Sequence, residues 1–165
     1  MPPWDTSAGF HGTAAAIEFA VLQLQVHNVV VCGHSHCGAI RGLYAPPPAE
    51  AHHLRAWLEL ARDAAVPEPE LPQVLRRVEQ RSIVLQLERL MSYPMVARRV
   101  RAGELFLHGW YYVIEDGRVL VFDADAGAFV PHALHSNARA TPVAAGSSVT
   151  EIDASHWMRV SQPHR

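Results

Sequence analysis

The feature that most constrains this chain is a long apolar helix followed directly by a short β-branched strand. Residues 12–26 read GTAAAIEFAVLQLQV, with apolar side chains nearly all round, which predicts a buried helix. Residues 29–32 read VVVC without polar alternation, a pattern typical of a strand covered on both faces. A buried helix that leads into a buried strand predicts an α/β fold with a mostly parallel sheet flanked by helices.

The remaining periodicity extends this layered fold. Apolar spacing predicts helices near residues 54–61, 71–91 and 95–101, and strands at 105–114 and 119–122 around a tight Asp116–Gly117 turn. Beyond Pro131 the composition shifts to Ala, Ser, Thr and His without sustained periodicity. We therefore predict one domain over residues 1–131 and a weakly ordered tail over residues 132–165.

Charge and hydropathy exclude two classes of partner. The 165 residues include 14 Lys and Arg against 16 Asp and Glu, a net charge of −2, and contain no basic run, so nucleic acid is not an expected partner. No apolar stretch approaches the roughly 18 to 20 residues of a membrane span. The first residues also lack the basic start and apolar run of a signal peptide, which makes the cytoplasm the expected compartment.

Candidate chemistry is concentrated in residues 32–38, which read CGHSHCG. His34 and Cys37 follow the predicted strand at a spacing that suits two ligands of a zinc ion, which takes nitrogen and sulfur donors in a tetrahedron. The only other cysteine is Cys32, and a disulfide between the two would close a very small loop. The spacing alone leaves two alternatives: a buried thiol beside a hydrogen-bonded loop histidine, and a thiol redox element, which the expected burial of Cys32 disfavours.

Four segments in order resemble the β-class carbonic anhydrases: GTAAAIEFAV at 12–21, VVVCGHSHCGAI at 29–40, SYPMV at 92–96 and GELFLHGWYY at 103–112. This resemblance implies the family fold and zinc-dependent, reversible hydration of carbon dioxide to bicarbonate and a proton. It also implies assembly as a homodimer or a higher homo-oligomer. Two of the three protein ligands that hold Zn²⁺ in the family map onto His34 and Cys37.

The departures from the family pattern bear on activity. The third family ligand is a cysteine in a Cys-x-Asp-Ser-Arg motif, and nothing upstream of Gly12 contains a cysteine or that Asp–Arg pair. The resemblance therefore implies that the first strand and the N-terminal helix are missing, which would leave the neighbours of an interior strand with unpaired backbone groups. The catalytic residues stay unknown. The alternative function is a catalytically inactive or truncated carbonic anhydrase-like module for zinc binding or oligomerisation.

The first residue suggests an explanation for these departures. Met1 stands where family members often have valine, and a GTG valine codon can be taken as a start codon. Our hypothesis is that the chain is the downstream part of a longer protein whose beginning was assigned too late. An in-frame stop codon close upstream, with no Cys-x-Asp-x-Arg coding, would refute it.

Other polar residues are further candidates for ligands or catalytic groups. Replacements for the third ligand would come from His36, Cys32, His11 and Asp5, none of which matches a family ligand. We expect Cys32 to be a small core residue and the other three to be solvated or hydrogen-bonded loop residues. Packing or solvation is likewise expected for a strand histidine, a turn with two carboxylates and a basic helix face: His108, Asp123, Asp125, Arg98, Arg99 and Arg101.

Overall fold

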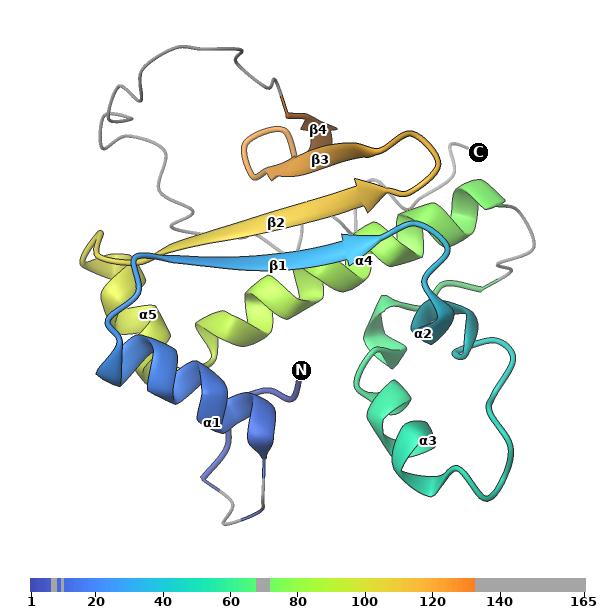
Figure 1. The fold of residues 1–165 in the computed structure, drawn as a ribbon, viewed down its shortest axis with the longest axis horizontal. Helices are drawn as coiled ribbons and strands as arrows, with labels where there is room; N and C mark the ends of the chain where they lie inside the picture. The colour runs from blue at the N-terminus through green and yellow to red at the C-terminus, as the bar shows by residue number, and fades with distance from the viewer. Residues whose placement is uncertain (7–8, 10, 68–71, 133–165) are drawn as a thin grey trace.

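The computed structural model describes residues 1–6, 9, 11–67 and 72–132. Figure 1 shows the elements in chain order. They are α1 (Gly12–Glu18), the π-helical turn η1 (Phe19–Gln23), β1 (Asn28–His34), α2 (Gly38–Arg41), α3 (His52–Glu59), the 3₁₀ turn η2 (Arg62–Ala64), α4 (Pro72–Met91), α5 (Pro94–Arg101), β2 (Phe106–Val113), β3 (Arg118–Asp123) and β4 (Ala128–Pro131). The expected helices and strands are present, and the four-residue strand β4 was not predicted. Residues 133–165 of the expected tail lie outside the described residues.

The sheet confirms the α/β class but is mixed within the described residues. Its strand order is β1-β2-β3-β4. β1 pairs with β2 in parallel from Asn28 opposite Phe106 to His34 opposite Tyr112, whereas β2–β3 and β3–β4 are antiparallel because tight turns join them. The sequence predicts unpaired backbone groups beside a missing interior strand. No such gap lies between β1 and β2, because these two strands pair directly.

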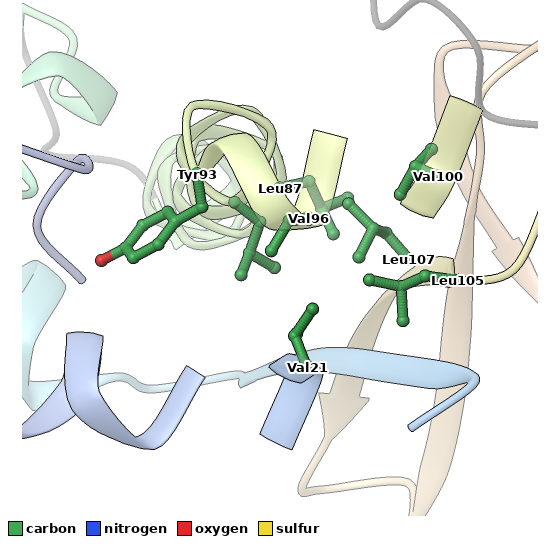
Figure 2. Close-up of a cluster of buried hydrophobic side chains, with 8 residues drawn as sticks. Val21, Leu87, Tyr93, Val96, Val100, Leu105 and Leu107 are labelled. Carbon is green, nitrogen blue, oxygen red and sulfur yellow. The ribbon is translucent and has the colours of Figure 1, made fainter. Parts of the chain in front are cut away.

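Helix α4 covers one face of the sheet and positions β1 and β2 (Figure 1). Two strand glycines allow this close approach: a Cβ atom at Gly33 would lie 2.8 Å from Ile83 Cδ1, and one at Gly109 would lie 3.1 Å from Leu87 Cδ1. The main core joins α4, α5 and β2, and Figure 2 shows Val21 pointing into it. Its buried members are Val21, Leu87, Leu90, Tyr93, Val96, Val100, Leu105 and Leu107.

The opposite face of the sheet is open within the described residues. Val30 is 41% exposed and Trp110 is 37% exposed, and Cys32 is also exposed. The prediction that the first strand is covered on both faces is therefore wrong here. Helix α4 covers one face of β1, and no described segment covers the opposite face. The buried-helix prediction holds only in part. Ala14 and Ile17 of α1 are partly buried against the main core, and Val21 of the following turn η1 is fully buried in it, but α1 has no fully buried residue.

One arginine of α5 is structural, contrary to the expected solvated basic face. The side chain of Arg99 is 12% exposed. Its guanidinium donates to the carbonyl oxygens of Val21 at 3.0 Å and of Gln25 and Glu104 at 3.2 Å. Carbonyl groups at the end of a helical segment lack intrahelical donors, so a buried cation is well suited to them. Arg98 and Arg101 are exposed, as predicted.

We predict that Arg99→Met destabilises the protein by about 1.5 to 3 kcal/mol, because it removes charge-assisted hydrogen bonds to carbonyl groups of the chain. Arg98→Met on the same helix is the matched control and should change the free energy of unfolding by less than about 0.5 kcal/mol. Urea denaturation of both variants measures the difference. Equal effects of the two substitutions would contradict the structural role of Arg99.

No helix among the described residues is long and apolar enough to cross a membrane.

Candidate metal centre

The turn after β1 brings the two predicted ligands to one cavity. β1 ends at His34, and Cys37 is the residue directly before α2, so both lie at the carboxyl end of the strand as expected. His36 between them has a φ angle of 59°, the left-handed conformation that turns the chain sharply. His34 and Cys37 both line a cavity of about 400 Å³ whose walls are largely apolar. Its apolar lining includes Val31, Ile40, Leu58 and Ile83.

Hydrogen bonds orient the His34 ring and hold the backbone of Cys37. The Nδ1 atom of His34 lies 2.8 Å from the carbonyl oxygen of Ser35, and since a carbonyl only accepts, Nδ1 must carry the proton. In the neutral ring the lone pair is then on Nε2. The backbone N–H of Cys37 donates to Glu79 Oε1 at 2.9 Å, and Tyr111 donates to the other oxygen of Glu79 at 2.5 Å. Burial and this hydrogen bond raise the pKa of Tyr111 above its ordinary value, so its hydroxyl remains a donor.

The donor atoms of this pair fit zinc, although the described residues supply only two of them. An imidazole nitrogen and a thiolate sulfur are ligands that Zn²⁺ prefers. Cys37 is a free thiol of intermediate exposure, which leaves its sulfur available. Among the described residues, no group of three or more His, Cys, Asp or Glu side chains is placed to hold a metal ion. The structure therefore brings together the predicted pair without a third protein ligand in the described part of the chain.

None of the candidate third ligands forms a three-residue cluster with His34 and Cys37 in the described part of the chain. The ring of His36 lies 3.0 Å from Glu115 Oε1 and 3.3 Å from Arg41 Nη2, so both its nitrogens have other partners. Cys32 lines the same cavity but is exposed on β1, and the expectation that it is a core residue is wrong because no described segment covers that face. Asp5 and His11 precede α1 and belong to no cluster of three potential ligands in the described chain.

His108 and Asp123, which the sequence offers as other candidate catalytic residues, have the structural roles expected of them. His108 Nε2 lies 2.9 Å from Asn28 Oδ1, and burial lowers the pKa of the ring, as expected for a packed, hydrogen-bonded histidine. Asp123 Oδ1 accepts hydrogen bonds from the backbone N–H groups of Asp125 and Ala126, at 2.9 and 3.0 Å. This is the turn geometry that the sequence predicts.

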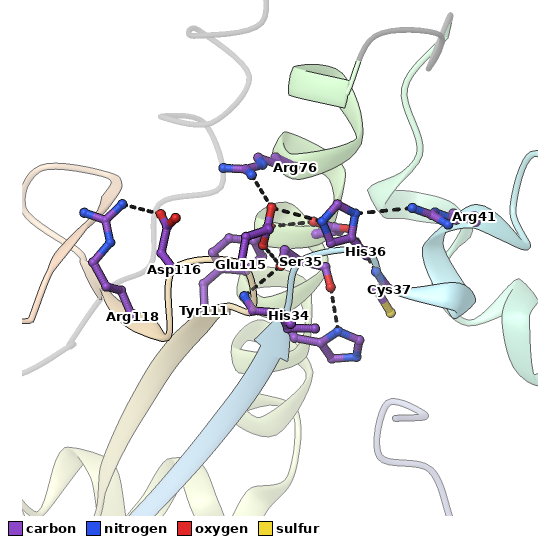
Figure 3. Close-up of polar contacts among 12 residues, drawn as sticks. His34, Ser35, His36, Cys37, Arg41, Arg76, Tyr111, Glu115, Asp116 and Arg118 are labelled. Atoms are coloured by element: carbon purple, nitrogen blue, oxygen red, sulfur yellow. Dashed lines mark hydrogen bonds and ion pairs between the residues drawn. The ribbon is translucent and has the colours of Figure 1, made fainter.

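Three residues that hold the turn were missed by sequence reasoning: Ser35, Glu79 and Glu115. Ser35 is fully buried and donates to Glu115 Oε2 at 2.5 Å. Glu115 also pairs with Arg76 and His36, and Figure 3 shows it on the opposite side of the turn from the His34 ring. The one signal in the sequence is the position of Ser35 between His34 and Cys37. Glu79 and Glu115 are 42 and 80 residues away from their partners in the turn.

These contacts predict a specific acid sensitivity. The Ser35 hydroxyl and the backbone N–H of Glu115 both donate hydrogen bonds to the Glu115 carboxylate. They lower its pKa to about 2, from 4.5 for an ordinary glutamate. The ionised carboxylate therefore stabilises the fold above pH 4.5, and this contribution is lost as the pH falls from 4.5 to about 2. We predict that Glu115→Gln flattens the pH dependence of urea unfolding in this interval. Parallel curves for the variant and the wild type would contradict the prediction.

Comparison with known proteins agrees with the arrangement of fold and turn. The sequence pattern of the carbonic anhydrase family matches residues 4–119. Carbonic anhydrase 1 of Escherichia coli O157:H7 is 34% identical over 139 residues, which are 80% of this chain and 63% of that protein. A carbonic anhydrase of Pseudomonas aeruginosa is 36% identical over 148 residues, covering 84% of this chain and 66% of the relative.

Solved structures give the same result for the fold. The β-carbonic anhydrase CcaA superposes with a TM-score of 0.71 at 34% identity, over 80% of this chain and 67% of that one. One of the tetrameric β-carbonic anhydrases of Sordaria macrospora gives a TM-score of 0.60 at 25% identity, over 73% of this chain and 62% of that one. The chain spans 50 to 66% of the length of the first three curated relatives that it matches. With the family pattern, the relatives and the fold in agreement, this chain belongs to the β-class of the carbonic anhydrase family.

Proposed function

We propose that this chain catalyses the reversible hydration of carbon dioxide to bicarbonate and a proton, with Zn²⁺ held by His34 and Cys37. The observation that carries the proposal is the position of these two donors on one largely apolar cavity, in a chain of the β-carbonic anhydrase family. When bound, zinc supplies a Lewis acid that makes a water molecule acidic near neutral pH.

The chain's own residues support this role in three ways. His34 is oriented by the Ser35 carbonyl so that Nε2 is its free donor atom. The backbone N–H of Cys37 donates to Glu79, a buried residue that is only 5% exposed and therefore holds Cys37 in place. The apolar walls from Val31 and Ile83 suit a small apolar substrate such as carbon dioxide.

Two measurements on the purified chain test the proposal. Metal analysis after equilibration with zinc gives the number of zinc ions per chain, and stopped-flow assays follow the proton released from carbon dioxide. We expect nearly one zinc per chain and turnover that His34→Gln abolishes. Turnover that persists in the metal-free protein would refute the proposal. So would a wild-type protein that binds no zinc, or one that shows no turnover.

The second candidate function is a module of the same family that binds zinc or oligomerises without catalysis. It is favoured by one observation: the described residues contain no third His, Cys, Asp or Glu placed with His34 and Cys37. Two protein ligands would bind the metal more weakly than three and leave more positions open. Stoichiometric zinc without turnover would establish this module, whereas stoichiometric zinc with turnover would exclude it.

We also propose that the chain assembles as a homodimer or a higher homo-oligomer. In support, Phe19 and Leu22 of η1 and Leu24 directly after it are 57, 44 and 61% exposed. Val30 and Trp110 add apolar surface on the open face of the sheet. Large apolar side chains left exposed in this number are typical of interaction surfaces. The Sordaria macrospora relatives are tetrameric.

We predict that Phe19→Glu weakens self-association by roughly 30-fold or more, because charging an interface centre costs about 2 kcal/mol or more. Leu54→Glu is the control, since Leu54 is 50% exposed on α3 and outside this patch. Sedimentation equilibrium measures the mass of each variant. A monomeric wild type at micromolar concentration, or equal effects of both substitutions, would contradict the prediction.

The compartment and the domain boundary complete the proposal. We propose a cytoplasmic location because Cys32 and Cys37 are both free, and reducing compartments keep thiols in that state.

We also propose that residues 1–131 form the carbonic anhydrase-like domain. Limited proteolysis followed by mass spectrometry tests the boundary, with cleavage expected after Pro131 and not within β4.

A further inference from the structure

Ser35 is the point at which the turn is tied to the rest of the fold. The residue is fully buried, and each of its polar groups is engaged. Its N–H donates to the carbonyl of Tyr112 at 2.9 Å, which continues the β1–β2 pairing by one residue. Its hydroxyl accepts the N–H of Ile114 at 2.9 Å and donates to Glu115 at 2.5 Å. Its carbonyl accepts Nδ1–H of His34 at 2.8 Å.

Glu115 is itself fixed by polar partners on two other segments. Its Oε1 atom pairs with Arg76 from α4 and lies 3.0 Å from the ring of His36. Its Oε2 atom is left for Ser35. Figure 3 shows the resulting order, with Arg76 and Glu115 on one side of Ser35 and the His34 imidazole on the other. A carboxylate held in this way is a strong acceptor, and it sets the direction of the buried serine hydroxyl.

We propose that Glu115 is a positioning residue that acts through Ser35: it holds the Ser35 peptide so that the carbonyl fixes His34 as its Nδ1–H tautomer. The metal-binding consequence rests on the proposed role of His34 as a zinc ligand. A neutral imidazole with its proton on Nδ1 presents the Nε2 lone pair, whereas the other tautomer does not. Hydrogen bonds to the second nitrogen of a ligating histidine orient the ring, and losing them typically weakens metal binding about 10- to 100-fold.

The hairpin offers a matched set of variants. Glu115→Ala removes the acceptor for the Ser35 hydroxyl. Glu115→Gln keeps an acceptor oxygen in the same place and is the conservative rescue. Asp116→Ala removes the neighbouring carboxylate, which pairs with Arg118 and is the control. Neither Asp116 nor Arg118 has a hydrogen bond or ion pair with the turn residues in the described structure.

The tautomer is measured without any metal. Nitrogen-15 shifts of the His34 ring, recorded at a pH where it is neutral, report which nitrogen carries the proton. The chain has 11 histidines, so the signal is assigned from its loss in His34→Gln. We expect a single Nδ1–H tautomer in the wild type, in Glu115→Gln and in Asp116→Ala, and a mixture of tautomers in Glu115→Ala. Should that variant not fold, Glu115→Asp, whose shorter side chain reaches Ser35 less well, carries the same expectation.

Cobalt binding provides the second readout. Titration with Co²⁺, followed by its thiolate charge-transfer band, should show roughly 10-fold weaker binding for Glu115→Ala than for Glu115→Gln. A wild-type ring protonated on Nε2, or an unchanged tautomer in Glu115→Ala, would overturn the inference. So would an equal effect of Asp116→Ala. If the tautomer changes as expected but the wild type binds no Co²⁺, the positioning of His34 stands and its proposed ligand role fails.

Discussion

Cys37→Ser is expected to abolish stoichiometric zinc binding and the carbon dioxide hydration that depends on it. The structure places one nitrogen donor, His34, and one sulfur donor, Cys37, on the same cavity. Among the described residues no third potential ligand is clustered with them. Because a hydroxyl is a far poorer zinc ligand than a thiolate, the substitution removes half of the donor set. Loss of a supporting hydrogen bond alone costs about 10- to 100-fold in affinity, so loss of a ligand should exceed about 100-fold.

Cys32→Ser is the matched control for this prediction. Cys32 belongs to the same short segment and lines the same cavity, but it is exposed on β1 and precedes the turn. Competition with a chromophoric chelator measures the zinc affinity of both variants, and unchanged thermal unfolding of the metal-free proteins shows that the fold is intact. We expect wild-type affinity for Cys32→Ser. Equal losses in the two variants would show that the ligand set differs from the one proposed.

Leu87→Ala is expected to lower the free energy of unfolding by about 2 to 5 kcal/mol. Leu87 is 2% exposed in the C-terminal part of α4, where it faces the sheet and the α5 side chains of the main core (Figure 2). Its Cδ1 atom lies 3.1 Å from the position that a Cβ of Gly109 would occupy, so α4 and β2 are in close contact. Truncation therefore leaves a cavity between two rigid elements that cannot readily collapse.

Leu54→Ala provides the comparison for the core prediction. Leu54 is 50% exposed on α3, so the same loss of side-chain atoms should cost less than about 0.5 kcal/mol. Urea denaturation at a single protein concentration measures both variants. Since small proteins are stable by only about 5 to 15 kcal/mol, the Leu87 variant loses a large part of its stability. Similar costs for the two leucines would show that the α4–sheet contact is not the main core.

Most helices and strands could be predicted because their evidence is local. The 3.6-residue period of a helix is visible in α4 and α5, and β2 and β3 are short apolar runs on either side of an Asp116–Gly117 turn. Strand β4 was missed because its four residues are too few for a period to be recognised. The exposure of α1 and β1 was wrongly predicted for a different reason. An apolar run shows that a face can be buried, but a single sequence does not show which segment covers it.

The candidate site divides along the same line. His34 and Cys37 were recognisable because their three-residue spacing and their place after a strand are properties of one short segment. Ser35 is inside that segment, yet its importance depends on Glu115, which is 80 residues away. Arg99 was misinterpreted as solvated because its partners include the carbonyl groups of Val21 and Gln25, 78 and 74 residues earlier.

The sequence by itself therefore determined the α/β class, the position of the His34–Cys37 pair after a strand and, through four matching segments, the family. Each of these follows from residues close together in the chain, whose backbone geometry or spacing is set locally. Only the tertiary structure decided that β1 pairs with β2, that no described segment covers one face of the sheet, and that Glu79 and Glu115 hold the turn from two sides. Those features depend on packing between distant segments, and packing responds to shape and burial that no local pattern records.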